Sequence, residues 1–246
     1  MQSLPSFLLE KTGIKTPLIG FYDAPAKKDF EPLIQPNKSG HACVFAFYKQ
    51  WLLGKTLLIT KDNHGCGGAG NHLCGVATRS RKEFIRFLTD DEGLKATHEL
   101  MDQWLDFISP YHQQNSWVLI GPLKNDQYEY LKTITFFVTP DQLSMLMIGA
   151  QYFQSPDDPT PVIAPFGSGC MQLVSLFKNL EVPQAMIGAT DMAMRKYLPS
   201  DILAFTVTKP MFEKLCQLDE NSFLSKSFIE GLKKARKNDL LKKQEK

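Results

Sequence analysis

Residues 64–70 of the sequence, HGCGGAG, place an imidazole and a thiol inside a run of glycines. The run follows TLLIT at 56–60, an apolar segment typical of a buried strand. Cys66 and His64 have the residue types of a nucleophile and its general base, and the amides of a glycine-rich loop can stabilise an oxyanion. The same two side chains are also ligands for soft metal ions. We therefore expect the chemistry of this protein to take place in this segment.

The glycines at 65–70 also match the pattern G-x-G-x-x-G of dinucleotide-binding proteins. That fingerprint needs a helix directly after the glycines and a second hydrophobic strand that ends in an acid about 20 residues further on. Asp90 and Asp91 stand near that distance, but SRKEFIRFLT before them predicts a basic amphipathic helix instead of a strand. We therefore expect the glycines to serve Cys66, by adopting positive φ angles and letting the backbone pack closely around it.

The chain has five cysteines, at positions Cys43, Cys66, Cys74, Cys170 and Cys216. Their odd number, with no signal-peptide pattern at the N-terminus, argues against a disulfide framework and favours reduced thiols. No C-x-x-C pair is present, so any metal site has to be assembled from distant segments. Cys170 directly precedes MQLVSLFKNL, a predicted helix whose macrodipole would favour its thiolate form. Cys74 and Cys216 stand where a small buried hydrophobic residue would serve equally well.

Hydrophobic patterning predicts strands near 17–22, 56–60, 117–121, 133–138, 184–188 and 202–208. Helices are expected over 3–12, 40–54, 80–89 and 93–108, after Cys170, and from Pro140, where Thr139 and Gln142 form a capping box. The irregular spacing of strands and helices predicts an α+β fold, with a mixed β-sheet covered by helices. We expect one domain over residues 1–218 and a basic C-terminal helix or tail over 219–246.

Composition narrows the class of protein. The 246 residues are 43% hydrophobic, which is enough for a substantial core. A net charge of +2, from 28 basic and 26 acidic residues, gives no general attraction to nucleic acid. No apolar run is long enough to span a membrane. The sequence thus predicts a soluble, cytoplasmic protein with no nucleic-acid or membrane partner, and it leaves open the oligomeric state and whether the protein is an enzyme.

The cysteine segments, taken in order, resemble a known family. Cys43 lies in HACVFAF, Cys66 in HGCGG and Cys170 in FGSGCMQL, and a late G-A-T turn is followed by R-K-Y. This order is similar to domain-of-unknown-function family 169, whose three cysteines occur in patterns like F-C-x-x-L, H-x-C-x-G and G-x-x-S-V-C-A-D. The resemblance covers roughly residues 6–218. The matching positions are Cys43, His64, Cys66, Gly68, Cys170, Gly188 and Arg195. The chain departs from the family pattern at Gly67, where proline is common, at the extra Cys74, and in having Met-Gln for Ala-Asp after Cys170. The family has no agreed activity.

The resemblance and the residue types together predict that Cys43, Cys66 and Cys170 converge in space. Three thiolates suit zinc, with sulfurs roughly 4 Å apart, or an iron–sulfur cluster, with sulfurs roughly 6–7 Å apart. His64 could be the fourth ligand of either. Such a site implies a redox role or the transformation of a small molecule. His41 and His72 are expected to be surface or loop histidines and not ligands.

Two metal-free alternatives stay open. One is an enzyme with Cys66 as nucleophile and His64 as base. The other is a module that binds a small anionic ligand through the glycines and a bidentate guanidinium. Its predicted ligand-binding residues are Gly65, Gly67, Gly68, Gly70 and Arg195.

Overall fold

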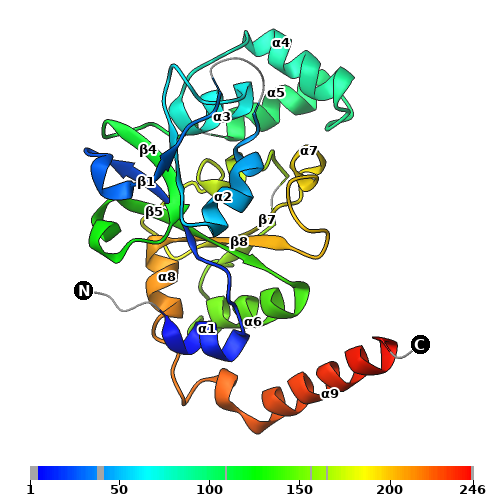
Figure 1. The fold of residues 1–246 in the computed structure, drawn as a ribbon. Coiled ribbons are helices and arrows are strands. Elements are labelled where there is room, and N and C mark those ends of the chain that lie inside the picture. Colours follow the sequence, from blue (N-terminus) through cyan, green and yellow to red (C-terminus); the bar gives the residue numbers. More distant parts are fainter. Residues whose placement is uncertain (1–4, 38–41, 109, 156, 165, 245–246) are drawn as a thin grey trace.

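The structure is a computed structural model that describes residues 5–37, 42–108, 110–155, 157–164 and 166–244. Its strands are β1 (Ile19–Ala24), β2 (Leu33–Ile34), β3 (Thr56–Ile59), β4 (Trp117–Pro122), β5 (Leu131–Val138), β6 (Val162–Ile163), β7 (Ala185–Gly188) and β8 (Leu203–Thr208). The α-helices are α1 (Ser6–Thr12), α2 (Tyr48–Leu52), α3 (Gly67–Cys74), α4 (Arg81–Arg86), α5 (His98–Phe107), α6 (Pro140–Gln151), α7 (Met192–Arg195), α8 (Lys209–Leu215) and α9 (Ser227–Gln244). Figure 1 shows their arrangement.

All described strands belong to one sheet of order β2-β3-β4-β1-β5-β8-β7-β6. The pairings β2–β3 and β6–β7 are parallel and the others are antiparallel, so the predicted mixed sheet of an α+β fold is confirmed. Each of the six predicted strands is present. The sequence analysis missed β2 and β6, the two edge strands, because two residues are too few to show an alternating pattern.

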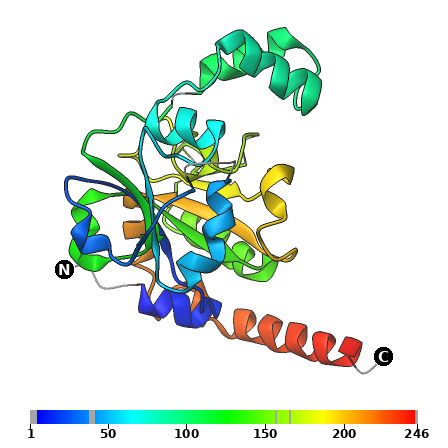
Figure 2. The ribbon, with the colours of Figure 1, turned by 45° about the horizontal axis from the view of Figure 1, so that its top comes forward.

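The two faces of the sheet are covered by two hydrophobic layers, because successive side chains of a strand point to opposite faces. On β1, Phe21 belongs to one layer and Tyr22 to the other. The first layer contains α2, α3 and the cysteine segments, and the second contains α1, α6 and α8. Figures 1 and 2 show these helices on either side of the strands, with α4 and α5 projecting beyond one end.

The sheet has an internal two-fold symmetry that the sequence does not reveal. If β1 is exchanged with β5, β2 with β6, β3 with β7 and β4 with β8, the strand order reads the same in reverse. Parallel pairs then superpose on parallel pairs, and antiparallel pairs on antiparallel pairs. The symmetry axis crosses the sheet where β1 pairs with β5. Each half of the chain therefore supplies one equivalent set of connections to each face.

Helix boundaries agree well where capping signals are strong. Thr139 caps α6, with Pro140 in the first turn and a complete capping box to Gln142, as predicted. Helix α1 ends at Gly13, whose φ of 68° is the left-handed conformation of a helix C-cap. The region predicted to be helical from residue 40 is a 3₁₀ turn, η2 (Val44–Phe47), followed by α2.

Two local predictions were wrong. The segment after Cys170 forms only a 3₁₀ turn, η5 (Met171–Leu173), because tertiary hydrogen bonds replace the helical ones: Thr133 Oγ1 donates to the carbonyl of Leu173, and Ser175 Oγ donates to that of His72. Conversely, the glycine-rich run is not a loop, since α3 begins at Gly67. Glycine has low helix propensity, so burial of the apolar face of α3 has to offset it.

The C-terminal segment contacts the rest of the fold. Leu224 is fully buried in the layer that also contains Leu218, and Arg236 of α9 forms an ion pair with Asp141 of α6 at 2.9 Å. The boundary predicted at residue 218 stays a prediction. No helix in the described part of the chain is long and apolar enough to cross a membrane.

Candidate functional site

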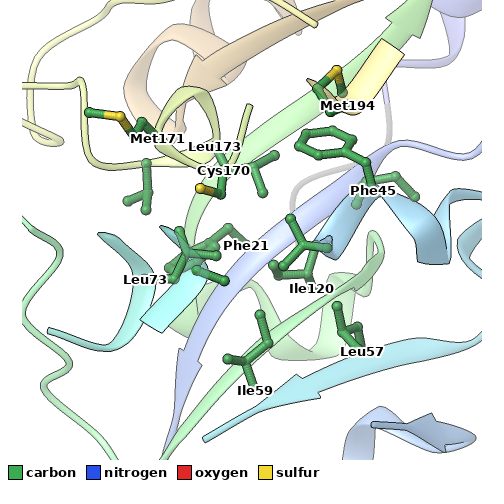
Figure 3. Packing of buried hydrophobic residues seen from close by; sticks show 14 of the residues in the cluster. Phe21, Phe45, Leu57, Ile59, Leu73, Ile120, Cys170, Met171, Leu173 and Met194 are labelled. Carbon is green, nitrogen blue, oxygen red and sulfur yellow. The ribbon is translucent and has the colours of Figure 1, made fainter. Parts of the chain in front are cut away.

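Three cysteines stand at the starts of three helical turns on the same face of the sheet. Cys43 is the N-cap of η2, Cys66 of α3 and Cys170 of η5. Cys170 is buried in the hydrophobic layer, and Cys43 and Cys66 pack against that layer. Figure 3 shows Cys170 among the buried side chains of Phe21, Leu73 and Leu173. At Cys66 the N-cap position directs a backbone amide toward the thiol, since Ala69 N–H donates to Cys66 Sγ at 3.4 Å.

The Cys43 and Cys66 segments are joined next to the cysteines. The backbone N–H of Ala42 donates to the carbonyl of Gly65 at 3.0 Å. Gly65 has a φ of 80°, and a Cβ at this position would lie 2.5 Å from the carbonyl oxygen of Ala42. Only glycine can adopt this conformation at this closeness without strain. The positive φ predicted for the glycine run is thus present at Gly65, where it brings two cysteine segments together.

Gly68 lies where the sulfurs of Cys66 and Cys170 face each other. A Cβ built on Gly68 would be 3.4 Å from Cys170 Sγ and 4.0 Å from Cys66 Sγ. The two sulfurs are therefore at most 7.4 Å apart, the sum of these two distances. Such a separation is within the span of an iron–sulfur cluster and of a closer metal site alike.

Gly169 lies where the segments that begin at Cys43 and Asp191 pack against the segment of Cys170. A Cβ there would lie 2.8 Å from Met194 of α7 and 2.9 Å from Phe45 of η2. Figure 3 shows the side chains of Phe45 and Met194 beside each other. The N–H of Gly169 also donates to Asp191 Oδ2 at 2.9 Å. The segments that begin at Cys43, Cys170 and Asp191 are therefore packed against one another with no space for a larger residue at position 169.

Asp191 is a residue near the cysteines that the sequence analysis did not single out. It is the N-cap of α7, and its Oδ1 accepts from Ala193 N–H at 2.9 Å. Burial is the main cause of the raised pKa of the thiols of Cys43, Cys66 and Cys170, and the charge of Asp191 adds to it. The signal that could have found it is an aspartate, a preferred N-cap residue, placed directly before the segment MAMR that forms α7.

Burial keeps the three thiols protonated at neutral pH. It raises the pKa of Cys43 to about 11, and it raises the pKa of Cys66 and of Cys170 as well. The thiols of Cys43 and Cys66 add to this effect at Cys170 because like charges disfavour ionisation. The expectation that a helix macrodipole favours the Cys170 thiolate was wrong, since η5 is a single turn and desolvation dominates.

A cavity of about 350 Å³ lies next to the segments that lead into Cys170 and Asp191. Asp191 and Ser168 line it, together with Thr190 and Glu92. Ser168 Oγ lies 3.6 Å from Cys170 Sγ, so the lining of the cavity extends to one of the thiols. Burial and the nearby charge of Asp191 raise the pKa of Glu92. The cavity therefore reaches the segment of Cys170 at Ser168, while the thiol of Cys170 itself is buried.

His64 and the remaining glycines support α3. His64 Nδ1 lies 2.9 Å from the carbonyl oxygen of Cys66, and its ring packs on Gly70, where a Cβ would lie 2.9 Å from the ring. A Cβ on Gly67 would lie 2.6 Å from Thr78 Oγ1. His72 is buried, against expectation, and burial lowers its pKa to about 4. His41 lies outside the described residues.

The other two cysteines pack as apolar residues. Cys74 is buried on the same layer, and burial raises its pKa to about 12. Cys216 packs against the layer on the opposite face of the sheet. All five thiols are free.

Arg195 is engaged with the backbone. Its guanidinium donates to the carbonyls of Ala189, Ile202, Pro199 and Ser200. These bonds fasten α7 to the segment before β8. The ligand role predicted for Arg195 stays a prediction, but four of its donors already have protein partners.

We expect Arg195→Lys to lower the free energy of unfolding by about 2 kcal/mol, because an ammonium cannot reach four carbonyls at once. Urea denaturation measures this effect. If the side chain instead holds an anionic ligand by its charge, the lysine variant will keep the stability of the parent and part of the ligand affinity.

A structural zinc ion needs about four donor atoms close together. Among the side chains that the structure describes, no three from His, Cys, Asp and Glu are close enough to hold a single metal ion as they stand. A mononuclear zinc site is therefore not preformed.

These features define an α+β protein with three cysteines gathered at helix N-caps on one face of a pseudo-symmetric sheet. The chain belongs to the family DUF169, described as uncharacterised ArCR, whose sequence model matches residues 8–217. The resemblance noted from the cysteine motifs is thereby confirmed. No curated protein and no solved structure matches the chain.

Proposed function

We propose that this protein binds an iron–sulfur cluster through Cys43, Cys66 and Cys170, and uses it for redox chemistry or for transforming a small molecule in the adjoining cavity. The proposal is supported by three cysteines from distant segments that cap helical turns on one face of the sheet and lie near one another. Cluster potentials depend on hydrogen bonds to sulfur, and the N-cap amide of Ala69 supplies one to Cys66.

The electrostatics favour a metal over the two metal-free alternatives. A cysteine nucleophile needs a lowered pKa, whereas burial raises the pKa of Cys66. An anion-binding site needs positive charge, whereas Asp191 places negative charge beside all three thiols. Bound iron would offset both effects. It deprotonates thiols outright, and its positive charge attracts a carboxylate.

The spacing of the Cys66 and Cys170 sulfurs is compatible with a cluster. A single zinc ion would need sulfurs roughly 4 Å apart in tetrahedral geometry. The described side chains offer no such group of three. The upper bound of 7.4 Å on the separation of the Cys66 and Cys170 sulfurs leaves room for the sulfur spacing of a cluster.

The test is metal and sulfide analysis of the protein purified without oxygen, before and after incubation with ferrous iron and sulfide. We expect on the order of four iron atoms and four sulfides per chain, with a broad visible absorbance that reduction bleaches. One zinc per chain and no iron would replace the cluster by a mononuclear site. A chain that retains neither metal under these conditions would contradict the proposal.

A further inference from the structure

The pseudo-two-fold symmetry of the sheet relates the residues of the site in pairs. Cys43 caps the turn that follows β2, and Cys170 caps the turn that follows β6, the symmetry equivalent of β2. Cys66 caps the helix that follows β3. In the equivalent place after β7, the N-cap is Asp191.

In each half of the sheet, one hydrogen bond links the two connections that carry these N-caps. The residue before Cys43 donates its N–H to the Cys66 segment, at the carbonyl of Gly65. The residue before Cys170 donates its N–H to Asp191, at Oδ2. The connections after β2 and β3 therefore correspond to those after β6 and β7, and all four lie on one face of the sheet. Three of their four N-caps are cysteines, and the fourth is Asp191.

We propose that Asp191 is the fourth ligand of the site formed by Cys43, Cys66 and Cys170, and that it holds the iron that faces the cavity. This inference rests on the proposed function. A carboxylate oxygen binds ferrous iron, and it is exchanged more readily than a thiolate. Because Asp191 lines the cavity, the iron it holds is the one that an entering small molecule can reach.

The position of Asp191 is set by neighbouring residues. Gln172 is buried, and its Oε1 accepts from Ala189 N–H at 2.7 Å while its Nε2 donates to Thr190 Oγ1 at 2.8 Å. Ala189 has a φ of 61°, a conformation that a non-glycine residue adopts only where its surroundings enforce it. The turn before Asp191 is thus held rigidly, as expected for a residue that supplies a ligand.

The experiment uses full-length protein reconstituted with ferrous iron and sulfide in the absence of oxygen, as wild type and as Asp191→Asn, Asp191→Cys, His64→Ala and Glu92→Gln. Asparagine keeps an N-cap oxygen, so α7 remains capped. Glu92→Gln is the matched control, because Glu92 lines the same cavity and lacks an N-cap position. Bound iron, the electron paramagnetic resonance spectrum of the reduced protein and circular dichroism are measured.

We expect Asp191→Asn to fold and to lose one iron per cluster, or to bind iron about tenfold more weakly, and Asp191→Cys to restore binding with an altered resonance spectrum. Glu92→Gln and His64→Ala should retain the wild-type iron content. Unchanged iron and spectrum in both Asp191 variants would overturn the inference and leave the proposed function standing. So would loss of iron in His64→Ala alone, or a failure of Asp191→Cys to restore it. A wild-type chain that binds no iron overturns both proposals.

Discussion

Cys66→Ser is expected to abolish iron and sulfide binding while leaving the fold intact. Serine is a preferred N-cap residue, so it can accept the hydrogen bond that Ala69 N–H donates to the thiol. The free energy of unfolding of the apo protein should change by less than about 1 kcal/mol. Bound iron should fall from several atoms per chain to none, because hydroxyl oxygen is a poor substitute for a thiolate toward iron.

Cys216→Ser is the matched control for this loss. Cys216 is half-buried like Cys66, but it packs on the opposite face of the sheet. It should retain the full iron content. Equal loss of iron in the two variants would place the metal elsewhere or attribute it to nonspecific thiol binding.

Gly68→Ala should change stability and metal binding in opposite directions. Gly68 lies in α3, where alanine is favoured over glycine by up to about 1 kcal/mol. The new methyl group would be in ordinary contact with both sulfurs, at 3.4 Å from Cys170 and 4.0 Å from Cys66. The apo protein should therefore unfold at higher urea concentration. Iron binding should weaken about tenfold or more, since the methyl group occupies space next to both ligands.

Gly231→Ala is the control that separates the change in helix propensity from the change in iron binding. Gly231 lies in α9, and a Cβ there has no neighbour within 4 Å. This substitution should leave iron binding unchanged. If Gly68→Ala binds iron as tightly as the parent protein, the cluster does not lie between Cys66 and Cys170.

The sequence determined much of the fold because its strands carry a dense apolar pattern. TLLIT at 56–60 and TITFFVT at 133–139 are buried strands, as their composition predicts. The family could also be recognised from three short cysteine motifs. Both results depend on local signals that are read within one segment of the chain.

The local signal was insufficient where tertiary contacts compete with it. The glycine-rich run was expected to be a loop, but Ala69 and Leu73 bury a helical face there. The segment after Cys170 was expected to be a helix, but its carbonyls and side chains bond to β5 and α3. Intrinsic propensities differ by about 1 kcal/mol per residue, so a few buried contacts can outweigh them.

The candidate site, like the fold, was predictable from local sequence only in part. The sequence identified Cys43, Cys66 and Cys170 as chemically interesting, and their residue types alone favour a soft metal. It gave no sign that Asp191 lies with them, because the equivalence of Asp191 and Cys66 is a property of the strand order and not of residue identity. Only the tertiary structure decides which N-caps meet, since that depends on how two halves of a sheet pair across β1 and β5.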